Sequence, residues 1–315
     1  MQKRKSKAPN IPEEASRFFE EGMRYNSLSY YLKKELGHKT IKLSIDGGFT
    51  CPNRDGSKGT GGCIFCSDTG SGEFASNIEE QIQLLSDKWP DAYYLAYFQN
   101  HTNTYAPVDE LRKKYYEVLE NPKIKGLVIG TRPDCLQDEV LDLLEEINKE
   151  HFMWVELGLQ SIHDKTSDFI NRCYDLEVFD DAMAKLKARN IKAVVHLIMG
   201  LPGESKEEML ESVKYVANMK PFGMKLHLLN IVKGARLEED YSDYLPFESI
   251  DEYVKHIVKA LELIPPEVTI HRLTGDAPRK ILISPPWSYK KRTILNGIQE
   301  ELRKSKTWQG KRVNG

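Results

Sequence analysis

The chain has 315 residues, with 45 Lys and Arg against 47 Asp and Glu, a formal net charge of −2 and 40% hydrophobic residues. This composition is typical of a globular protein and excludes extensive disorder. The longest apolar runs, 191–201 and 226–232, are too short to span a membrane, and the basic start MQKRKSKAPN is not followed by an apolar signal region, so we expect a cytoplasmic protein without a membrane partner.

Strand and helix patterns alternate through the middle of the chain. Helices are predicted at 13–25 and 29–36, before a first strand at 41–45 and a loop rich in glycine and cysteine. Short apolar, aromatic or β-branched runs predict further strands at 93–98, 126–129, 154–159, 192–198 and 224–230. Amphipathic patterns predict helices between them at 78–89, 108–119, 137–149, 177–189 and 206–218. Six strands with intervening helices predict a parallel α/β sheet, either open and doubly wound or curled into an incomplete barrel.

The alternation stops at Gly234. An acidic connection then leads to a predicted helix at 250–263, a short strand at 267–273 and a basic helix at 290–306. We therefore expect three parts: an N-terminal helical extension at 1–37, an α/β core at 38–234 and a small α+β C-terminal module at 235–315 that contacts substrate or RNA.

Three of the five cysteines lie in the loop after the first strand. Cys51 and Cys63 are separated by eleven residues, Cys63 and Cys66 by two, and six glycines lie between 47 and 62. An odd cysteine count without a secretory signal argues against a disulfide framework, whereas three thiolates on one loop can bind a soft metal centre. We expect the separate Cys135 and Cys173 to be small buried side chains.

The number of ligands distinguishes two kinds of metal centre. A structural zinc site needs a fourth ligand, and the closest candidates outside the loop are His38 and His101. A four-iron cluster is normally held by four thiolates, so three would leave one iron open to an external ligand.

These residues resemble the radical S-adenosylmethionine (radical SAM) superfamily. Phe65 precedes the last cysteine, as is usual there, and the pattern CPNRDG…GGCIFC resembles the YtqA/YhcC-type family; the long first gap resembles the branch with the elongator catalytic subunit. The resemblance implies a partial (β/α)6 TIM-like barrel and a [4Fe–4S] cluster held by Cys51, Cys63 and Cys66. It also implies S-adenosyl-L-methionine (SAM) on the fourth iron and an electron donor such as flavodoxin or ferredoxin.

The resemblance also implies a set of SAM-binding residues. They are Phe65, Asn100, His101, Thr102, Thr131, Arg132, Glu156, Gln160, Arg172, His196, Met199 and Gly200. Arg172 is expected to pair with the carboxylate of SAM, because a guanidinium is a fixed planar donor. A second interpretation stays open: Glu156 and Gln160 simply face a polar barrel interior, and LIMGLPGES is a strand-to-helix turn capped by Ser205.

The two ends of the chain are basic although the total charge is −2. Residues 1–10 carry four Lys or Arg, and residues 287–315 carry two acids against eight basic residues, namely Lys290, Lys291, Arg292, Arg303, Lys304, Lys306, Lys311 and Arg312. Such segments either contact the phosphates of RNA or form a solvated surface without a partner.

The family resemblance implies tRNA as the partner. The YtqA-type family is associated with conversion of 5-carboxymethylaminomethyl to 5-aminomethyl uridine at the wobble position, for which a base of the anticodon stem-loop must leave its stack. Arg272 and Arg279 are the candidates to bind the substrate carboxylate. Two alternatives remain: a radical SAM enzyme acting on a small metabolite or tetrapyrrole, and a non-enzymatic, metal-stabilised RNA-binding scaffold.

Overall fold

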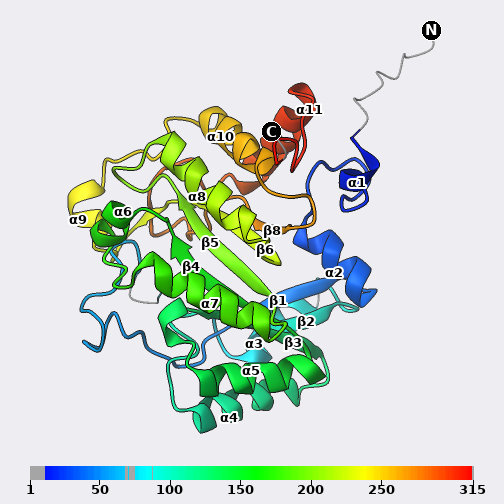
Figure 1. Ribbon diagram of the computed structural model, residues 1–315, viewed down its shortest axis with the longest axis vertical. Coiled ribbons are helices and arrows are strands. Elements are labelled where there is room, and N and C mark those ends of the chain that lie inside the picture. Colours follow the sequence, from blue (N-terminus) through cyan, green and yellow to red (C-terminus); the bar gives the residue numbers. More distant parts are fainter. Residues whose placement is uncertain (1–10, 68–69, 71–74, 87, 314–315) are drawn as a thin grey trace.

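A curled half-barrel of seven parallel strands forms the centre of the molecule (Figure 1). A computed structural model describes residues 11–67, 70, 75–86 and 88–313. The strands, in their order along the sheet, are β1 (Thr40–Ile45), β2 (Tyr93–Phe98), β3 (Ile124–Thr131), β4 (Phe152–Gln160), β5 (Ala193–Met199), β6 (Gly223–Leu228) and β8 (Thr269–Arg272). A separate antiparallel pair joins β7 (Ile231–Val232) to β9 (Leu282–Ser284). Because β1 and β8 are the two edges, the barrel stays open between them.

Helices cover the outer face of this sheet (Figure 1). They are α3 (Ile78–Ser86), α4 (Val108–Leu119), α5 (Asp138–Glu150), α6 (Asp164–Phe169), α7 (Leu176–Ala188) and α8 (Lys206–Asn218), with a 3-10 turn at Pro133–Cys135. The other helices are α1 (Glu13–Ser16), α2 (Leu28–Leu36), α9 (Leu237–Tyr241), α10 (Ile250–Glu262) and α11 (Lys291–Lys304). No helix in the described part of the chain is both long and apolar enough for a membrane crossing.

The six predicted strands are confirmed, with each boundary within two residues of its prediction. The predicted start of α8 is confirmed as well: the Ser205 hydroxyl accepts from the Glu208 backbone N–H at 3.2 Å, and the Glu208 carboxylate accepts from the Ser205 N–H at 2.9 Å. This reciprocal cap satisfies two N–H groups that would otherwise lack partners. The segment after β5 is therefore the strand-to-helix turn capped by Ser205 that the second interpretation of LIMGLPGES predicted.

The C-terminal stretch contributes a strand to the main sheet. The segment predicted as a strand at 267–273 forms β8, which pairs in parallel with β6 through Met224 and Ile270. The half-barrel thus has seven strands rather than six, and its last strand comes from beyond Gly234. The division of the chain into three parts remains a prediction.

The prediction of one helix over 13–25 is wrong. Only Glu13–Ser16 is helical, and the following residues form turns. Gly22 has a φ of 81°, a left-handed conformation that cannot continue a right-handed helix. Phe19 is buried against the protein, so tertiary contacts rather than helix periodicity fix this segment.

A buried glutamine ties the start of the described chain to its end. The Gln309 side chain accepts from the backbone N–H of Asn26 at 2.9 Å and donates to the carbonyls of Pro265 at 2.7 Å and Val268 at 2.8 Å. Gln309 is fully buried. It therefore joins the segment before α2 to the turn that leads into β8, and so helps to fix one edge of the half-barrel.

We expect Gln309→Ala to lower the free energy of unfolding by at least about 2 kcal/mol, because three buried backbone groups lose their partner. Urea denaturation followed by circular dichroism measures this change. Asn296→Ala, at an exposed position of α11, is the control and should stay within about 0.5 kcal/mol of the parent. Equal stability of the Gln309 variant and the parent would show that the tie does not stabilise the fold.

Candidate functional site

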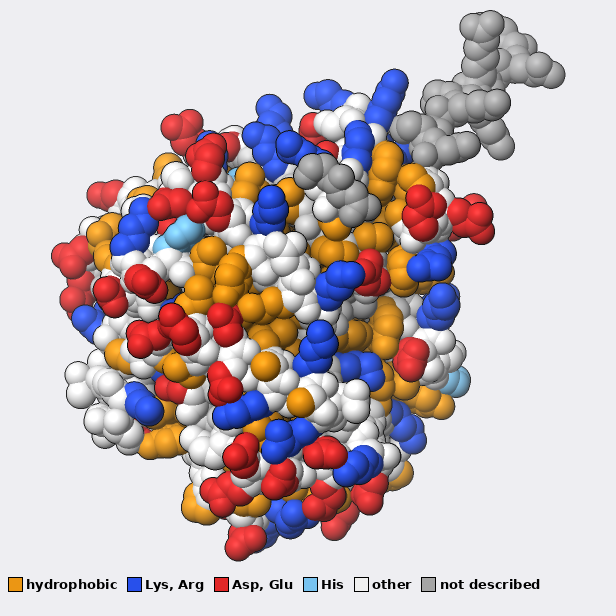
Figure 2. Space-filling model, viewed as in Figure 1, with side chains coloured by type: hydrophobic (Ala, Val, Ile, Leu, Met, Phe, Trp, Pro, Cys, Tyr) orange, Lys and Arg blue, Asp and Glu red, His pale blue; other side chains and the backbone are white. Residues whose placement is uncertain are grey.

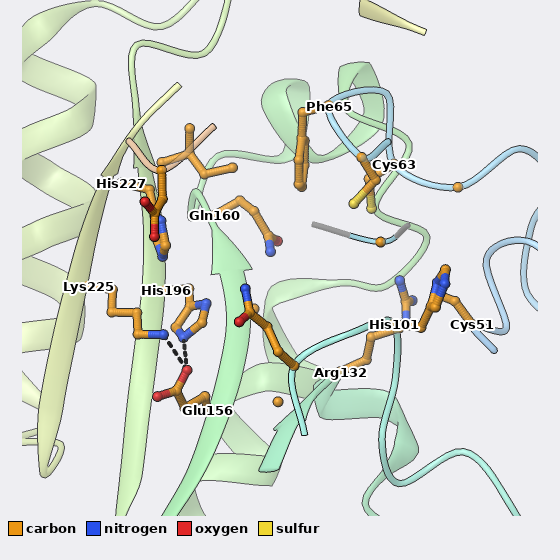
Figure 3. A pocket seen from close by; sticks show the side chains of 18 of the residues that line it. Cys51, Cys63, Phe65, His101, Arg132, Glu156, Gln160, His196, Lys225 and His227 are labelled. Carbon is orange, nitrogen blue, oxygen red and sulfur yellow. Dashed lines mark hydrogen bonds and ion pairs between the residues drawn. The ribbon is translucent and has the colours of Figure 1, made fainter. Parts of the chain in front are cut away.

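One pocket of about 410 Å³ runs along the inside of the half-barrel, from the cysteine loop to β8 (Figure 3). Its lining includes the three clustered cysteines and most of the residues that the sequence suggested. These are Cys51, Cys63, Phe65, Cys66, His101, Thr102, Thr131, Arg132, Glu156, Gln160, Arg172, His196 and Arg272. They come from four strands and four loops, so the fold brings together residues more than 200 positions apart.

Four predicted residues do not line this pocket: Asn100, Met199, Gly200 and Arg279. Met199 is fully buried in the apolar core, because alternation along β5 turns it to the helix side. A Cβ at Gly200 would lie 2.3 Å from the Pro246 Cβ, so Gly200 serves close packing in the turn. The exposed Arg279 places its guanidinium 4.6 Å from the ring centroid of Tyr289.

The cysteine loop is held by its own backbone. The N–H of Arg54 donates to the carbonyl of Cys51 at 2.8 Å, and the N–H of Cys66 donates to the carbonyl of Cys63 at 3.0 Å. Gly59 is required by close approach, since a Cβ there would lie 2.3 Å from Oδ1 of Asn53. Asn53 is fully buried, and its amide donates to the Cys63 Sγ at 3.5 Å. The loop therefore places Cys63 at the pocket, with its Sγ held by a hydrogen bond from Asn53.

The donor set fits an iron–sulfur cluster. Among the described residues, no three His, Cys, Asp or Glu side chains are placed to hold a single metal ion, whereas all three loop cysteines line the pocket. The hydrogen bond with Cys66 and desolvation raise the pKa of the Cys63 thiol, and a positively charged centre bound there would lower it. Three soft ligands around an open cavity are suited to a centre larger than one ion.

Arg172 is positioned for an external anion. Its side chain is completely buried, with Nε donating to the Tyr174 carbonyl at 3.1 Å and Nη1 donating to the carbonyls of Leu159 at 2.9 Å and Ser161 at 2.6 Å. Nη2 is buried and has no hydrogen-bond partner within the described residues. Because Arg172 lines the pocket, a carboxylate there would satisfy this donor and the charge together.

Several residues near the cysteine loop hold an uncommon backbone conformation. Positive φ angles occur at His101 (58°), Gln160 (66°), Asn171 (54°) and Cys173 (60°), none of which is glycine. With its amide oriented to match its neighbours, Gln160 donates to the carbonyls of Gly158 at 3.2 Å and Leu159 at 2.8 Å. Left-handed non-glycine residues gather at binding sites, where surrounding contacts enforce them.

A buried carboxylate lies at the other end of the pocket, where Glu156 of β4 is 1% exposed (Figure 3). Its Oε1 accepts from Lys42 Nζ at 3.1 Å and from Trp154 Nε1 at 3.0 Å. Its Oε2 contacts His196 Nε2 at 2.9 Å and forms an ion pair with Lys225. Burial alone would raise the pKa of Glu156, but the charges of Lys225 and Lys42 and the His196 hydrogen bond hold it well below its usual value.

His196 is neutral in this environment. Burial, together with the charge of Lys225, lowers its pKa to about 4, although Glu156 opposes the shift. His196, Lys225 and Arg272 are also register partners on neighbouring strands, so β5, β6 and β8 present them at one level of the barrel.

Lys42, Tyr97 and Lys225 are pocket residues that the sequence analysis missed. A signal for them exists in the strand patterns. In IKLSI and GMKLHL, polar residues occupy alternate positions of otherwise apolar strands: Lys42 with Ser44, and Lys225 with His227. A parallel sheet covered on both faces needs apolar residues throughout, so a polar row indicates an inner face that is open to a ligand.

Family models match most of this chain. A model of the radical SAM superfamily matches residues 56–216, and a model of the radical SAM C-terminal domain matches residues 221–304. The fold with three loop cysteines at the open end of a parallel half-barrel therefore defines a radical SAM protein, and the chain belongs to that superfamily.

Individual relatives narrow this assignment. The chain is 43% identical over 297 residues to the uncharacterized protein YtqA of Bacillus subtilis, covering 91% of this chain and 92% of YtqA. It belongs to the YtqA/YhcC-type family that its sequence resembles. It is also 26% identical over 258 residues to a tRNA uridine(34) acetyltransferase of Methanocaldococcus jannaschii, covering 79% of this chain and 41% of that relative.

A solved structure shares the fold. The archaeal Elp3 of Methanocaldococcus infernus, with an N-terminal deletion, has a TM-score of 0.61 at 18% identity, covering 83% of this chain and 63% of that chain. Family membership implies a [4Fe–4S] cluster and SAM as cofactors, and it supports an enzyme rather than a binding scaffold.

Proposed function

We propose that this protein converts 5-carboxymethylaminomethyl uridine at the wobble position of tRNA to 5-aminomethyl uridine. The observation that carries the proposal is a single pocket that joins the three cysteines at one end to Arg272 at the other. A pocket of this kind suits a substrate whose reacting carbon is next to a carboxylate. The similarity to a tRNA uridine(34) acetyltransferase supports the choice of tRNA.

In this proposal Cys51, Cys63 and Cys66 hold the cluster, and the unpaired Nη2 of Arg172 binds the carboxylate of SAM. The cluster and SAM, when bound, supply a 5′-deoxyadenosyl radical that abstracts hydrogen. The chain's own residues orient the substrate and keep water from the radical. An electron donor such as flavodoxin or ferredoxin reduces the cluster in the cytoplasm.

The glycyl methylene of the substrate is the proposed abstraction point. Loss of its hydrogen atom leaves a carbon radical that the neighbouring nitrogen and carboxylate stabilise. Transfer of one further electron to a one-electron acceptor, with release of the N–H proton, gives an imine, and its hydrolysis then cleaves the carbon–nitrogen bond. The products are the aminomethyl base and a two-carbon aldehyde acid.

The basic surface around α11 is the proposed contact for the anticodon stem-loop. Lys and Arg side chains gather there, close to the C-terminal end of the chain (Figure 2). Arg303 and Lys304 form the last turn of α11, with Lys311 and Arg312 just beyond it. These charges fit the salt-sensitive phosphate contacts of RNA. The basic residues predicted at 1–10 lie outside the described residues.

The cysteine assignment predicts which variants lose iron. Cys63→Ala, reconstituted without oxygen, should lose the four-iron signal, because two thiolates remain in the loop. Cys135→Ala and Cys173→Ala are the controls, since neither cysteine belongs to the cysteine loop or lines the pocket, and they should keep the cluster. Iron analysis and electron paramagnetic resonance measure the outcome, and a four-iron signal that persists in Cys63→Ala would refute the assignment.

The role of Arg172 predicts weaker SAM binding in Arg172→Lys. The lysine keeps a positive charge near the carbonyls but loses the second nitrogen of the planar guanidinium, which has no hydrogen-bond partner among the described residues. A charge-assisted hydrogen bond is worth about 1.5–3 kcal/mol, so affinity should fall about ten- to hundredfold in calorimetry of the reconstituted protein. Arg112→Lys, at a surface ion pair with Glu146, should bind SAM like the parent. Unchanged affinity in Arg172→Lys would remove this residue from the SAM site.

Isotope transfer tests the reaction itself. The enzyme is incubated with SAM, a reductant and tRNA that carries the substrate deuterated at the glycyl methylene. Deuterium should appear in 5′-deoxyadenosine while 5-aminomethyl uridine accumulates, as measured by mass spectrometry. Product without deuterium transfer would exclude this abstraction point. Absence of product, in a preparation that cleaves SAM, would favour the small-metabolite or tetrapyrrole alternative.

A further inference from the structure

Cations outnumber carboxylates at the end of the pocket that is remote from the cysteines. Glu156 is shared by Lys42 and Lys225, with Lys42 at 3.1 Å from the carboxylate. Asp276 is likewise shared, by Arg272 at 2.7 Å and by Lys291. Each carboxylate thus faces two cations within the described structure. With His196 neutral, the group keeps an excess of positive charge.

Burial makes this excess unfavourable. The side chains of Glu156 and Lys225 are 0% and 3% exposed, so solvent screens them poorly. Burial, with the charges of Lys42 and Arg272, lowers the pKa of Lys225 despite its contact with Glu156. Burial also lowers the pKa of Arg272 and, together with the charge of Arg272, that of Lys291. An anion placed among these groups would oppose each of these shifts, because an opposite charge favours the charged form of a cation.

The existing contacts leave donors for such an anion. Glu156 already receives four donors, whereas Lys42 makes one hydrogen bond within the described residues and has three N–H groups. Arg272 directs Nη2 to Asp276, and its other nitrogens form no further ion pair in the described part. The side chains of Lys42 and Arg272 are 21% and 28% exposed, and both line the pocket.

The groups around Lys225 come from every strand packed against it. They are Lys42 of β1, Tyr97 of β2, Glu156 of β4, His196 of β5, His227 of β6, and His271 and Arg272 of β8. Tyr97 contacts both lysines, with Lys42 Nζ 4.5 Å and Lys225 Nζ 4.9 Å from its ring centroid. Its hydroxyl accepts from Lys225 at 3.3 Å. The two ammonium groups are therefore held by the same aromatic ring and the same carboxylate.

We propose that Lys42, Lys225 and Arg272 form an anion-binding subsite that receives the carboxylate of the substrate side chain. The substrate named here rests on the proposed function. A terminal carboxylate fits better than an RNA phosphate, because a phosphate is joined to ribose on both sides and cannot enter the barrel as the end of an arm. Glu156 acts as the fixed counter-charge that positions the lysines. This subsite selects substrates whose arm ends in a negative charge.

Two anticodon stem-loop RNAs test the subsite. One carries 5-carboxymethylaminomethyl uridine, and the other carries the same arm with a carboxamide in place of the carboxylate. The dissociation constants of both RNAs are measured with the reconstituted, SAM-bound enzyme. The parent should prefer the carboxylate by about ten- to hundredfold, as expected for a charge-assisted hydrogen bond. Lys42→Gln, at a partly exposed site, should bring this preference close to one.

Lys225→Met tests the buried lysine with the same two RNAs. It should also bring the preference for the carboxylate close to one. Lys290→Gln, an exposed cation that does not line the pocket, is the matched control. It can weaken both RNAs through their shared phosphates but should keep the preference. SAM cleavage without RNA and the melting temperature show that each variant is folded.

The outcomes separate this subsite from the proposed function. An unchanged preference in folded Lys42→Gln and Lys225→Met, or no preference in a parent that converts the carboxylate RNA, would overturn the subsite. A parent that prefers the carboxylate but converts neither RNA would overturn the proposed function and support the subsite. Loss of preference in both variants but not in Lys290→Gln would establish it.

Discussion

The interior of the half-barrel depends on one buried carboxylate. Glu156 lies at the centre of β4 and contacts Lys42 on one edge strand, His196 on the neighbouring strand and Lys225 beyond it. Since neither β1 nor β6 is next to β4 in the sheet, these ion pairs link strands that are not neighbours. A buried ion pair adds little net stability against an apolar core, but loss of one partner is costly. Its retention here is consistent with a requirement for fixed charges beside the substrate.

The two faces of the sheet differ in polarity, because one packs against helices and the other lines the pocket. Toward the helices, residues such as Leu127, Ile129 and Met199 are fully buried and apolar. Toward the cavity, alternate positions carry Lys, His, Glu and Gln, which in a closed and filled barrel would be unpaired. The polar interior is tolerated because its members pair with one another and face a ligand pocket. The pocket therefore accounts for the polar residues at alternate strand positions, and packing against the helices accounts for the apolar ones.

The position of the cysteine loop links this interior to the radical chemistry of the superfamily. The loop follows β1 and closes one end of the pocket, and Arg172 with its unpaired nitrogen lies beside it. The cationic residues lie at the other end. In the proposed complex, the carboxylate of SAM lies at the cysteine end and the carboxylate of the substrate lies at the cationic end. The reacting atoms of the two molecules then lie between these ends. This arrangement gives a physical basis for excluding water from the reacting centre.

The sequence by itself determined the strands, most of the helices and the cysteine loop, because these depend on local periodicity, turn residues and short spacings. It also indicated Glu156, His196 and Arg172 through their resemblance to a known family. It misplaced the helix at 13–25, where burial of Phe19 and the left-handed Gly22 override local pattern. Only the tertiary structure decided that β8 completes the sheet, that Lys42 and Lys225 share the Glu156 carboxylate, and that Arg272 is the register partner of Lys225. The two contacts of Glu156 join residues 114 positions apart (Lys42) and 69 positions apart (Lys225). Such pairings follow from strand order and register, which no local pattern specifies.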